Sequence, residues 1–104
     1  MTSLTRGQVV RADIGLDEPK LFVVVSNNRR NRALPTILGV RLTTSPKPPM
    51  ASIVEFGQDE VFVGRACCDD ITALWEDEIL SVVGAISPRG MSAIRDGLGA
   101  ALGL

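Results

Sequence analysis

The stretch ILSVVGAISPRGMSAIRDGLGAALGL, residues 79–104, changes its hydrophobic period part-way along. Its first part, residues 79–86, is an apolar run of strand length. Ser87 then is a good N-cap and Pro88 suits a first helical position. After them, four apolar residues fall on one helical face: Met91, Ile94, Leu98 and Leu102. We therefore expect a strand followed by an amphipathic C-terminal helix. Gly97 and Gly99 each lower the stability of this helix by about 1 kcal/mol relative to alanine, so packing against the rest of the chain must hold it.

The residues before position 79 have the pattern of short strands and lack a helical period. Strands are expected over residues 7–14, 20–26 and 36–44, then over a hairpin formed by 51–56 and 61–68. The run at 20–26 is apolar throughout and should be buried on both sides, while Gly39 suggests a bend or bulge. Residues 69–78 are ambiguous, with a short strand and one helical turn as the expectation. Several strands followed by one helix favour an antiparallel sheet curled into a small open barrel.

Two segments between these strands lack the pattern of regular structure. NNRRNRALP, residues 27–35, has no periodicity and is predicted to be a loop that holds three arginines. SPKPP, residues 45–49, contains three prolines that cannot donate to a ladder, so we expect an exposed loop at the rim of the barrel.

Length and composition place the chain in the class of small globular proteins. The 104 residues with 45% hydrophobic content suit one domain covering residues 1–104. No apolar run approaches the roughly 20 residues that cross a bilayer, and Met1 to Arg6 lacks the hydrophobic stretch of a secretory signal. We therefore expect a cytoplasmic protein.

The residue types that are absent restrict the chemistry. The chain has no histidine and no tyrosine, which removes the usual general base and the usual zinc ligand. Cys67 and Cys68 are sequence neighbours without the spacing of a metal or redox motif, so a structural role is expected. No metal and no cofactor are predicted.

Charge is distributed unevenly, although the net charge is only −1. Residues 19–54 contain no acid but six cations: Lys20, Arg29, Arg30, Arg32, Arg41 and Lys47. Residues 55–78 contain eight acids against Arg65 alone. Salt screens charges beyond about 8–10 Å, so a basic patch in the first half could bind a phosphate backbone independently of the acids. The alternative is that both halves are ordinary solvated surfaces.

Five segments, in this order, resemble the MazF/PemK family of toxins from type II toxin–antitoxin systems. These are RGQVVRADI (6–14), VVVSNNRRN (23–31), VRLTTS (40–45), ACCDDITAL (66–74) and VGAISPRGMSAIRDGLGAALGL (83–104). The resemblance covers nearly the whole chain. It implies an SH3-like barrel with a C-terminal helix, a homodimer, and metal-independent cleavage of single-stranded RNA to 2′,3′-cyclic phosphate and 5′-hydroxyl ends. It also implies a cognate MazE-like antitoxin that lays an acidic tail along the RNA groove.

The family's catalytic pair is an arginine six residues before the serine of the Ser-Asn motif and the first threonine of a Thr-Thr pair. By resemblance these positions are Lys20 and Thr43, so a lysine replaces the family arginine. The proline that normally follows the arginine is Leu21, and the preceding loop is shorter than usual. A family carboxylate in that loop has no secure counterpart, and Glu18 is not assigned its role.

RNA cleavage through the 2′-hydroxyl requires proton transfer and positive charge on the phosphorane oxygens. Lys20 could protonate the leaving oxygen or supply charge, and Thr43 could donate a hydrogen bond to a phosphate oxygen. Arg41 lies two residues before Thr43 on the same strand, so it faces the same side and could grip the phosphate.

The remaining predicted RNA contacts are Arg29, Arg30, Arg32, Thr44 and Lys47. Simple solvation is the alternative for each of the three loop arginines. Trp75 is expected to serve in core packing or a dimer contact rather than in base stacking. Two other functions stay open: a CcdB-like toxin that binds gyrase without nuclease activity, and a weakened relative that only binds RNA or antitoxin.

Overall fold

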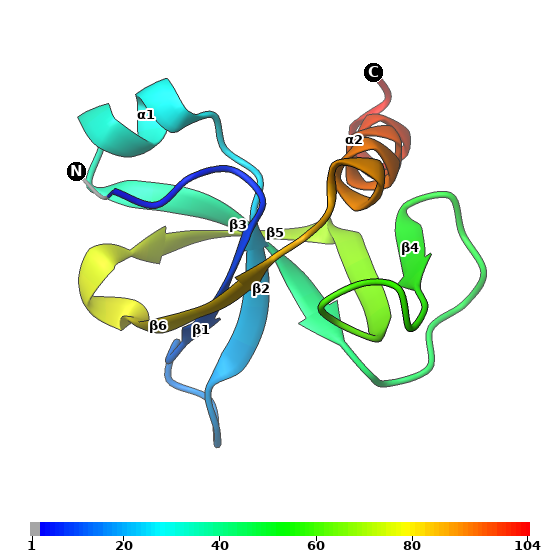
Figure 1. Ribbon diagram of the computed structural model, residues 1–104, viewed down its shortest axis with the longest axis horizontal. Coiled ribbons are helices and arrows are strands. Elements are labelled where there is room, and N and C mark those ends of the chain that lie inside the picture. The colour runs from blue at the N-terminus through cyan, green and yellow to red at the C-terminus, as the bar shows by residue number, and fades with distance from the viewer. Residues whose placement is uncertain (1–2) are drawn as a thin grey trace.

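The computed structural model describes residues 3–104. Its elements, in chain order, are β1 (Gln8–Ala12), β2 (Lys20–Val24), α1 (Asn28–Ala33), β3 (Thr36–Thr43), β4 (Ile53–Phe56), β5 (Gly64–Trp75), the single 3-10 turn η1 (Glu76–Glu78), β6 (Ile79–Ala85) and α2 (Pro88–Leu102). All strand pairs are antiparallel, in the order β4-β5-β3-β2-β1-β6, and the sheet curls without closing (Figure 1). The predicted mainly β fold, an open antiparallel barrel with a C-terminal helix, is confirmed.

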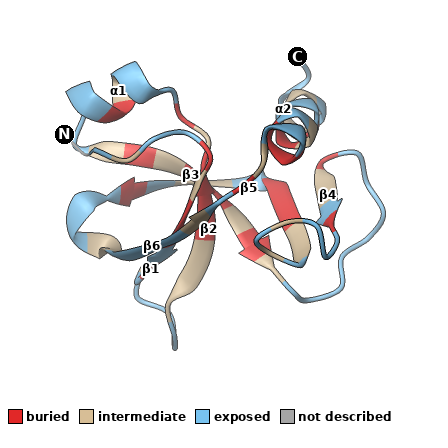
Figure 2. Cartoon of the chain, in the orientation of Figure 1, coloured by how far each residue is buried: buried red, intermediate tan, exposed pale blue. Residues whose placement is uncertain are grey.

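Strand β2 lies in the middle of the sheet and separates two apolar clusters. Val23 faces the cluster that α2 covers through Ile94, whereas Phe22 and Val24 face the second cluster together with Leu74. All three β2 residues are at most 1% exposed, and Figure 2 shows the buried positions concentrated in these central strands. The prediction that this strand is buried on both sides is confirmed.

Strand β5 bends sharply where it passes β3. Val40 pairs with Ile71, but the next residue, Arg41, pairs with Cys67, so extra residues of β5 lie opposite one step of β3. We expected the irregularity at Gly39, and this expectation is wrong. Gly39 keeps regular register, and a Cβ there would lie 3.0 Å from the Phe22 Cβ, so close packing accounts for the glycine.

The segment predicted as a loop at residues 27–35 contains the helix α1 instead. Asn27 caps it, since its side chain accepts the Arg30 backbone N–H at 2.8 Å. Asn31 is fully buried and its amide donates to the Ser26 carbonyl at 3.1 Å. A six-residue helix held by polar contacts leaves no hydrophobic period in the sequence, which explains the error.

Helix α2 has the predicted start, with Ser87 accepting the Gly90 N–H at 3.0 Å and Pro88 in its first turn. Met91 and Ile94 are buried as predicted, whereas Leu102 at the far end is 58% exposed and does not join the core. Within residues 3–104, no helix combines the length and the apolar character needed to span a bilayer.

Candidate active site

The start of β2 and the end of β3 form one rim of the sheet. Leu21 pairs with Leu42 in antiparallel register, so Lys20 and Thr43 lie at the same end of the two strands. A shallow cleft of about 260 Å³ opens between them. Its lining residues come from the turn before β2, from β2, from β3 and the loop after it, and from the segment before β5: Glu18, Pro19, Lys20, Leu21, Arg41, Leu42, Thr43, Thr44, Ser45 and Phe62. Four predicted site residues (Lys20, Arg41, Thr43 and Thr44) therefore meet in one cleft.

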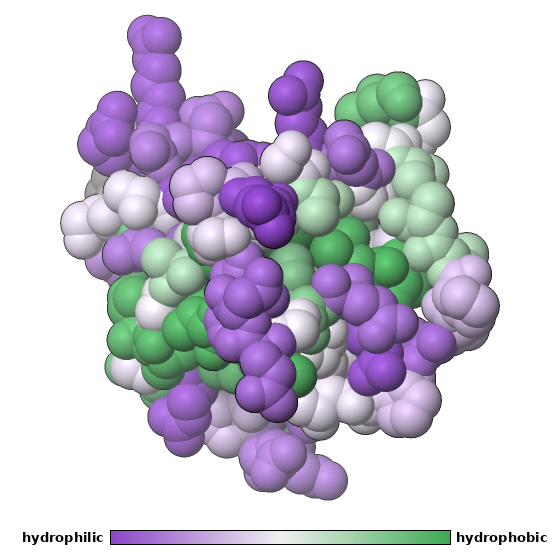
Figure 3. All heavy atoms as spheres, turned by 45° about the vertical axis from the view of Figure 1, so that its right-hand side comes forward, coloured by the Kyte–Doolittle hydropathy of each residue, from purple (hydrophilic) through white to green (hydrophobic). Residues whose placement is uncertain are grey.

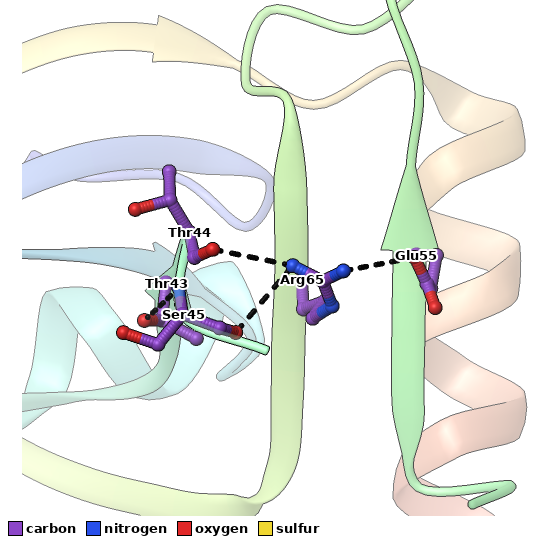
Figure 4. A network of polar contacts seen from close by, with 5 residues as sticks. All are labelled: Thr43, Thr44, Ser45, Glu55 and Arg65. Carbon is purple, nitrogen blue, oxygen red and sulfur yellow. Dashed lines mark hydrogen bonds and ion pairs between the residues drawn. The ribbon is translucent and has the colours of Figure 1, made fainter. Parts of the chain in front are cut away.

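The hydroxyl of Thr43 has a defined orientation. Its Oγ1 accepts the backbone N–H of Ser45 at 3.1 Å, which closes a small turn where β3 ends (Figure 4). Because this bond uses an acceptor lone pair, the hydroxyl proton stays available for donation. Thr43 can thus donate to a group bound in the cleft.

Lys20 has an acidic neighbour that sequence reasoning left without a role. The Glu18 Oε1 lies 3.5 Å from the Lys20 Nζ. The Glu18 side chain is 76% exposed and the Lys20 side chain 26% exposed, so this pair lies at the mouth of the cleft. Glu18 is the one carboxylate among the residues that line it. The signal that could have found it is its position two residues before Lys20, with a proline between them.

Arg41 contributes a second cation to the cleft floor. Leu42, between Arg41 and Thr43, faces the apolar cluster under α2, so Arg41 and Thr43 lie together on the opposite side of β3. The Arg41 Nε is buried and has no hydrogen-bond partner among the described residues. Because Arg41 also lines the cleft, its guanidinium charge is suited to an anionic ligand there.

Lys47 lies in the exposed loop after β3, as predicted for this proline-rich segment. Its charge acts on Cys67, which is buried in β5. Burial is the main cause that raises the pKa of the Cys67 thiol, Asp69 and Asp70 raise it further, and Lys47 and Arg41 oppose the rise. Lys47 lies in the loop that follows Thr43 and does not line the cleft.

The three arginines of α1 lie at the other end of the β2–β3 pair. Helix α1 connects the end of β2 to the start of β3, whereas the cleft lies at the start of β2 and the end of β3 (Figure 1). The eight residues of β3 separate the two ends by roughly 20 Å. Arg30 there donates to the Thr36 carbonyl at 2.9 Å, so it holds α1 to β3, while Arg29 and Arg32 are exposed. RNA contact by these three arginines stays a prediction, and it requires a surface separate from the cleft.

Trp75 is not a core residue. It is 53% exposed at the end of β5, so the expectation of core packing within the chain is wrong. The other expectation, that Trp75 contacts the second subunit of a dimer, stays a prediction.

A larger hollow of about 610 Å³ lies along the C-terminal half of α2. Small and apolar residues dominate its lining, with one cation and one acid, Arg95 and Asp96. It brings together neither a hydroxyl nor several cations, so the smaller cleft is the better candidate for chemistry on a phosphate.

Comparison with known proteins agrees with this arrangement. Residues 5–102 match the family model described as PemK-like, MazF-like toxin of type II toxin-antitoxin system. The chain belongs to this toxin family. The predicted MazF/PemK resemblance is thereby confirmed over nearly the whole sequence.

Named relatives of this toxin include two mycobacterial proteins. Endoribonuclease MazF1 of Mycobacterium bovis and endoribonuclease MazF4 of Mycobacterium tuberculosis are each 36% identical to it over 104 residues, covering 100% of this chain and 97% of the relative. A solved mycobacterial endoribonuclease in complex with its cognate antitoxin has 37% identity and a TM-score of 0.90, covering 97% of this chain and 96% of that one. MazF in a MazE–MazF structure from Deinococcus radiodurans, with 16% identity and a TM-score of 0.83 over 100% of this chain and 99% of that one, shows the shared fold.

Proposed function

We propose that this toxin is a sequence-specific, metal-independent endoribonuclease acting on single-stranded RNA in the cytoplasm. The observation that carries the proposal is the cleft in which Lys20, Arg41 and Thr43 converge. Two cations and an oriented hydroxyl at one rim suit a phosphodiester, and relatives that match the full chain are named endoribonucleases.

The cleft residues supply each part of a transesterification. The 2′-oxygen attacks the adjacent phosphorus while the bond to the 5′-oxygen breaks, which leaves a 2′,3′-cyclic phosphate and a 5′-hydroxyl. Glu18 accepts the 2′-hydroxyl proton, and the Lys20 ammonium donates a proton to the leaving oxygen. Arg41 and Thr43 stabilise the charge that develops on the non-bridging oxygens.

Lys20 at the family's arginine position changes the balance between these tasks. A lysine is a compact charge that can exchange its proton, whereas an arginine offers a planar fork for two phosphate oxygens. Arg41, which lines the same cleft, can supply that fork from the neighbouring strand. Proton transfer and phosphate binding are then divided between two residues.

The direct test uses a long unstructured RNA in EDTA, followed by mapping of the cut ends. Wild-type protein should make discrete cuts with cyclic-phosphate and 5′-hydroxyl ends. Thr43→Ala should lower the cleavage rate by about 10- to 1,000-fold, since removal of one oriented donor has effects of this order. The matched control is Thr72→Ala on β5, because Thr72 lies outside the cleft and should leave the rate unchanged.

Lys20 variants separate its two roles in the same assay. Lys20→Ala should lower the rate by about 10²- to 10⁴-fold if proton transfer by Lys20 limits it. Full activity in Lys20→Arg would assign Lys20 to charge rather than to proton transfer, and normal cleavage by Lys20→Ala would refute its role entirely. Intact RNA with retained RNA binding would identify a weakened relative. The relatives named above are MazF-type proteins, so the gyrase-binding alternative is not retained.

Two protein partners follow from the family. We infer a homodimer, because the edge strand β6 leaves Leu80, Val82 and Val83 about half exposed, and Val61 beside it is 55% exposed. The surface drawn in Figure 3 carries green apolar patches among hydrophilic residues.

A cognate MazE-like antitoxin with an acidic segment would suit the cationic cleft, as the relative solved with its antitoxin suggests. Sedimentation velocity of the toxin by itself should give twice the chain mass, and addition of the antitoxin should give a heavier species. A monomer at micromolar toxin concentration would contradict the dimer.

A further inference from the structure

Arg65, the lone cation of the acidic segment 55–78, lies one strand away from Thr43. In β5 it is the register partner of Thr43 on one side and of Glu55 on the other. Register partners of antiparallel strands project to the same face, so the three side chains form a row across β3, β5 and β4. Figure 4 shows this row from close by.

The guanidinium of Arg65 ties three segments together. Its Nη1 donates to the Thr44 carbonyl at 3.3 Å and to the Ser45 carbonyl at 3.4 Å, while its Nη2 lies 3.6 Å from the Glu55 Oε1. The Arg65 side chain is 25% exposed, so its geometry is restricted on most sides. Arg65 therefore holds the backbone of the loop that begins after Thr43.

The contact at Ser45 reaches the Thr43 hydroxyl. The carbonyl of Ser45 accepts from Arg65, and the N–H of Ser45 donates to the Thr43 Oγ1. A shift of Ser45 would change the direction from which Oγ1 receives this bond and hence the direction in which its proton points. Gly64 adds to the constraint: a Cβ there would lie 2.5 Å from the Thr43 carbonyl, so β5 begins in close contact with this turn.

One feature of Arg65 argues against a role in stability alone. Its Nε is buried without a hydrogen-bond partner among the described residues. A buried donor left unpaired costs free energy, and such a cost is often found where a residue serves a site.

We propose that Arg65 is a positioning residue for the reaction. It acts through Ser45 to aim the Thr43 hydroxyl into the cleft, and Glu55 holds Arg65 from the far side. This inference rests on the proposed function, because it presupposes that Thr43 serves in RNA cleavage.

Steady-state cleavage of the RNA by Arg65→Gln and Arg65→Lys tests the role. Both variants should lower kcat by about 10- to 100-fold with KM changed less than threefold, since a small misplacement of a reacting group costs about this much. Arg65→Lys keeps the positive charge but offers one nitrogen where Arg65 uses both Nη1 and Nη2, so this variant should not restore the wild-type rate. The matched control is Arg95→Gln on α2, which removes the same charge far from the cleft. Full activity in Arg65→Lys, or a raised KM with unchanged kcat in Arg65→Gln, would mean that Arg65 acts as a charge on RNA and would overturn the inference.

A double-mutant cycle with Thr43 excludes a purely structural effect. In the Thr43→Ala background, Arg65→Gln should lower the residual rate by less than twofold, because the group that it positions is already missing. A full multiplicative loss would contradict the inference. A readout independent of activity is the Thr43 methyl resonance, which should shift in Arg65→Gln and stay in place in Arg95→Gln.

A milder variant covers the case in which Arg65→Gln unfolds. Glu55 is 68% exposed, so Glu55→Gln should fold normally, lower kcat by about 3- to 10-fold and move the same Thr43 resonance. An unchanged rate together with an unmoved resonance would overturn the inference and leave the proposed function intact. If Thr43→Ala cleaves like wild type, the proposed role of Thr43 itself fails.

Discussion

Cys68 is fully buried under α2, where its Sγ lies 3.7 Å from the Ile94 carbonyl oxygen. Burial, followed by the neighbouring Cys67 and Asp69, raises the pKa of the Cys68 thiol from 9.0 to about 11. Between about pH 9 and pH 11 the unfolded chain therefore loses a proton that the folded chain keeps. The thiol's contribution to stability is complete below about pH 9 and falls as the pH rises through this window.

Urea unfolding at pH 8 and pH 10.5, for wild type and Cys68→Ser, measures this effect. The free energy of unfolding of wild type should fall by about 2 kcal/mol more than that of Cys68→Ser over this interval. Parallel pH profiles would show that the thiol ionises equally easily in both states.

Residues differ in how far the sequence reveals their role. The placement of Lys20 and Thr43 in one cleft could be predicted because each stands at a fixed place in a motif, and that of Arg41 followed from strand alternation, whereas their roles stay predictions. Arg65 lies in a run of acids, and its register with Thr43 depends on how β3 pairs with a strand that bends. Such a pairing across distant segments is not encoded in local spacing, so its position could not be predicted.

Elements with a hydrophobic period were predicted well, and the others were not. Strands β1 to β5 and helix α2 bury apolar residues, whereas β6 has an apolar sequence with no fully buried residue. Helix α1 depends instead on the cap Asn27 and the buried amide of Asn31. The irregularity in β5 lies opposite the step from Val40 to Arg41, and no local sequence signal marks that place.

Gly97 and Gly99, both in α2, predict opposite effects of alanine. A Cβ at Gly97 would lie 2.7 Å from the Cys68 Sγ and 2.9 Å from the Val54 Cγ2, so Gly97→Ala should destabilise the fold by about 1–3 kcal/mol. A Cβ at Gly99 meets nothing closer than the Leu104 carbonyl at 3.7 Å. Gly99→Ala should therefore stabilise by up to about 1 kcal/mol through helix propensity. Urea unfolding measures both, and equal effects would contradict the packing of α2 on β5.

At the scale of the whole molecule, the cations of the first half separate into two groups. Lys20 and Arg41 line the cleft, with Lys47 in the loop that follows Thr43, whereas Arg29 and Arg32 lie at the α1 end. This division follows from chain order, because residues 27–35 join the end of β2 to the start of β3, whereas Lys20 begins β2 and Thr43 ends β3. A single-stranded RNA that contacted both groups of cations would have to extend along the sheet for roughly 20 Å.

We propose that the reaction takes place between Lys20 and Thr43. The most direct measurement is a crystal structure of the toxin with an RNA that carries a 2′-deoxy substitution at the cleaved position. We expect the phosphate at that position to lie within hydrogen-bonding distance of the Thr43 Oγ1, beside Lys20 and Arg41. A phosphate bound at the α1 end, with the cleft unused, would contradict this proposal.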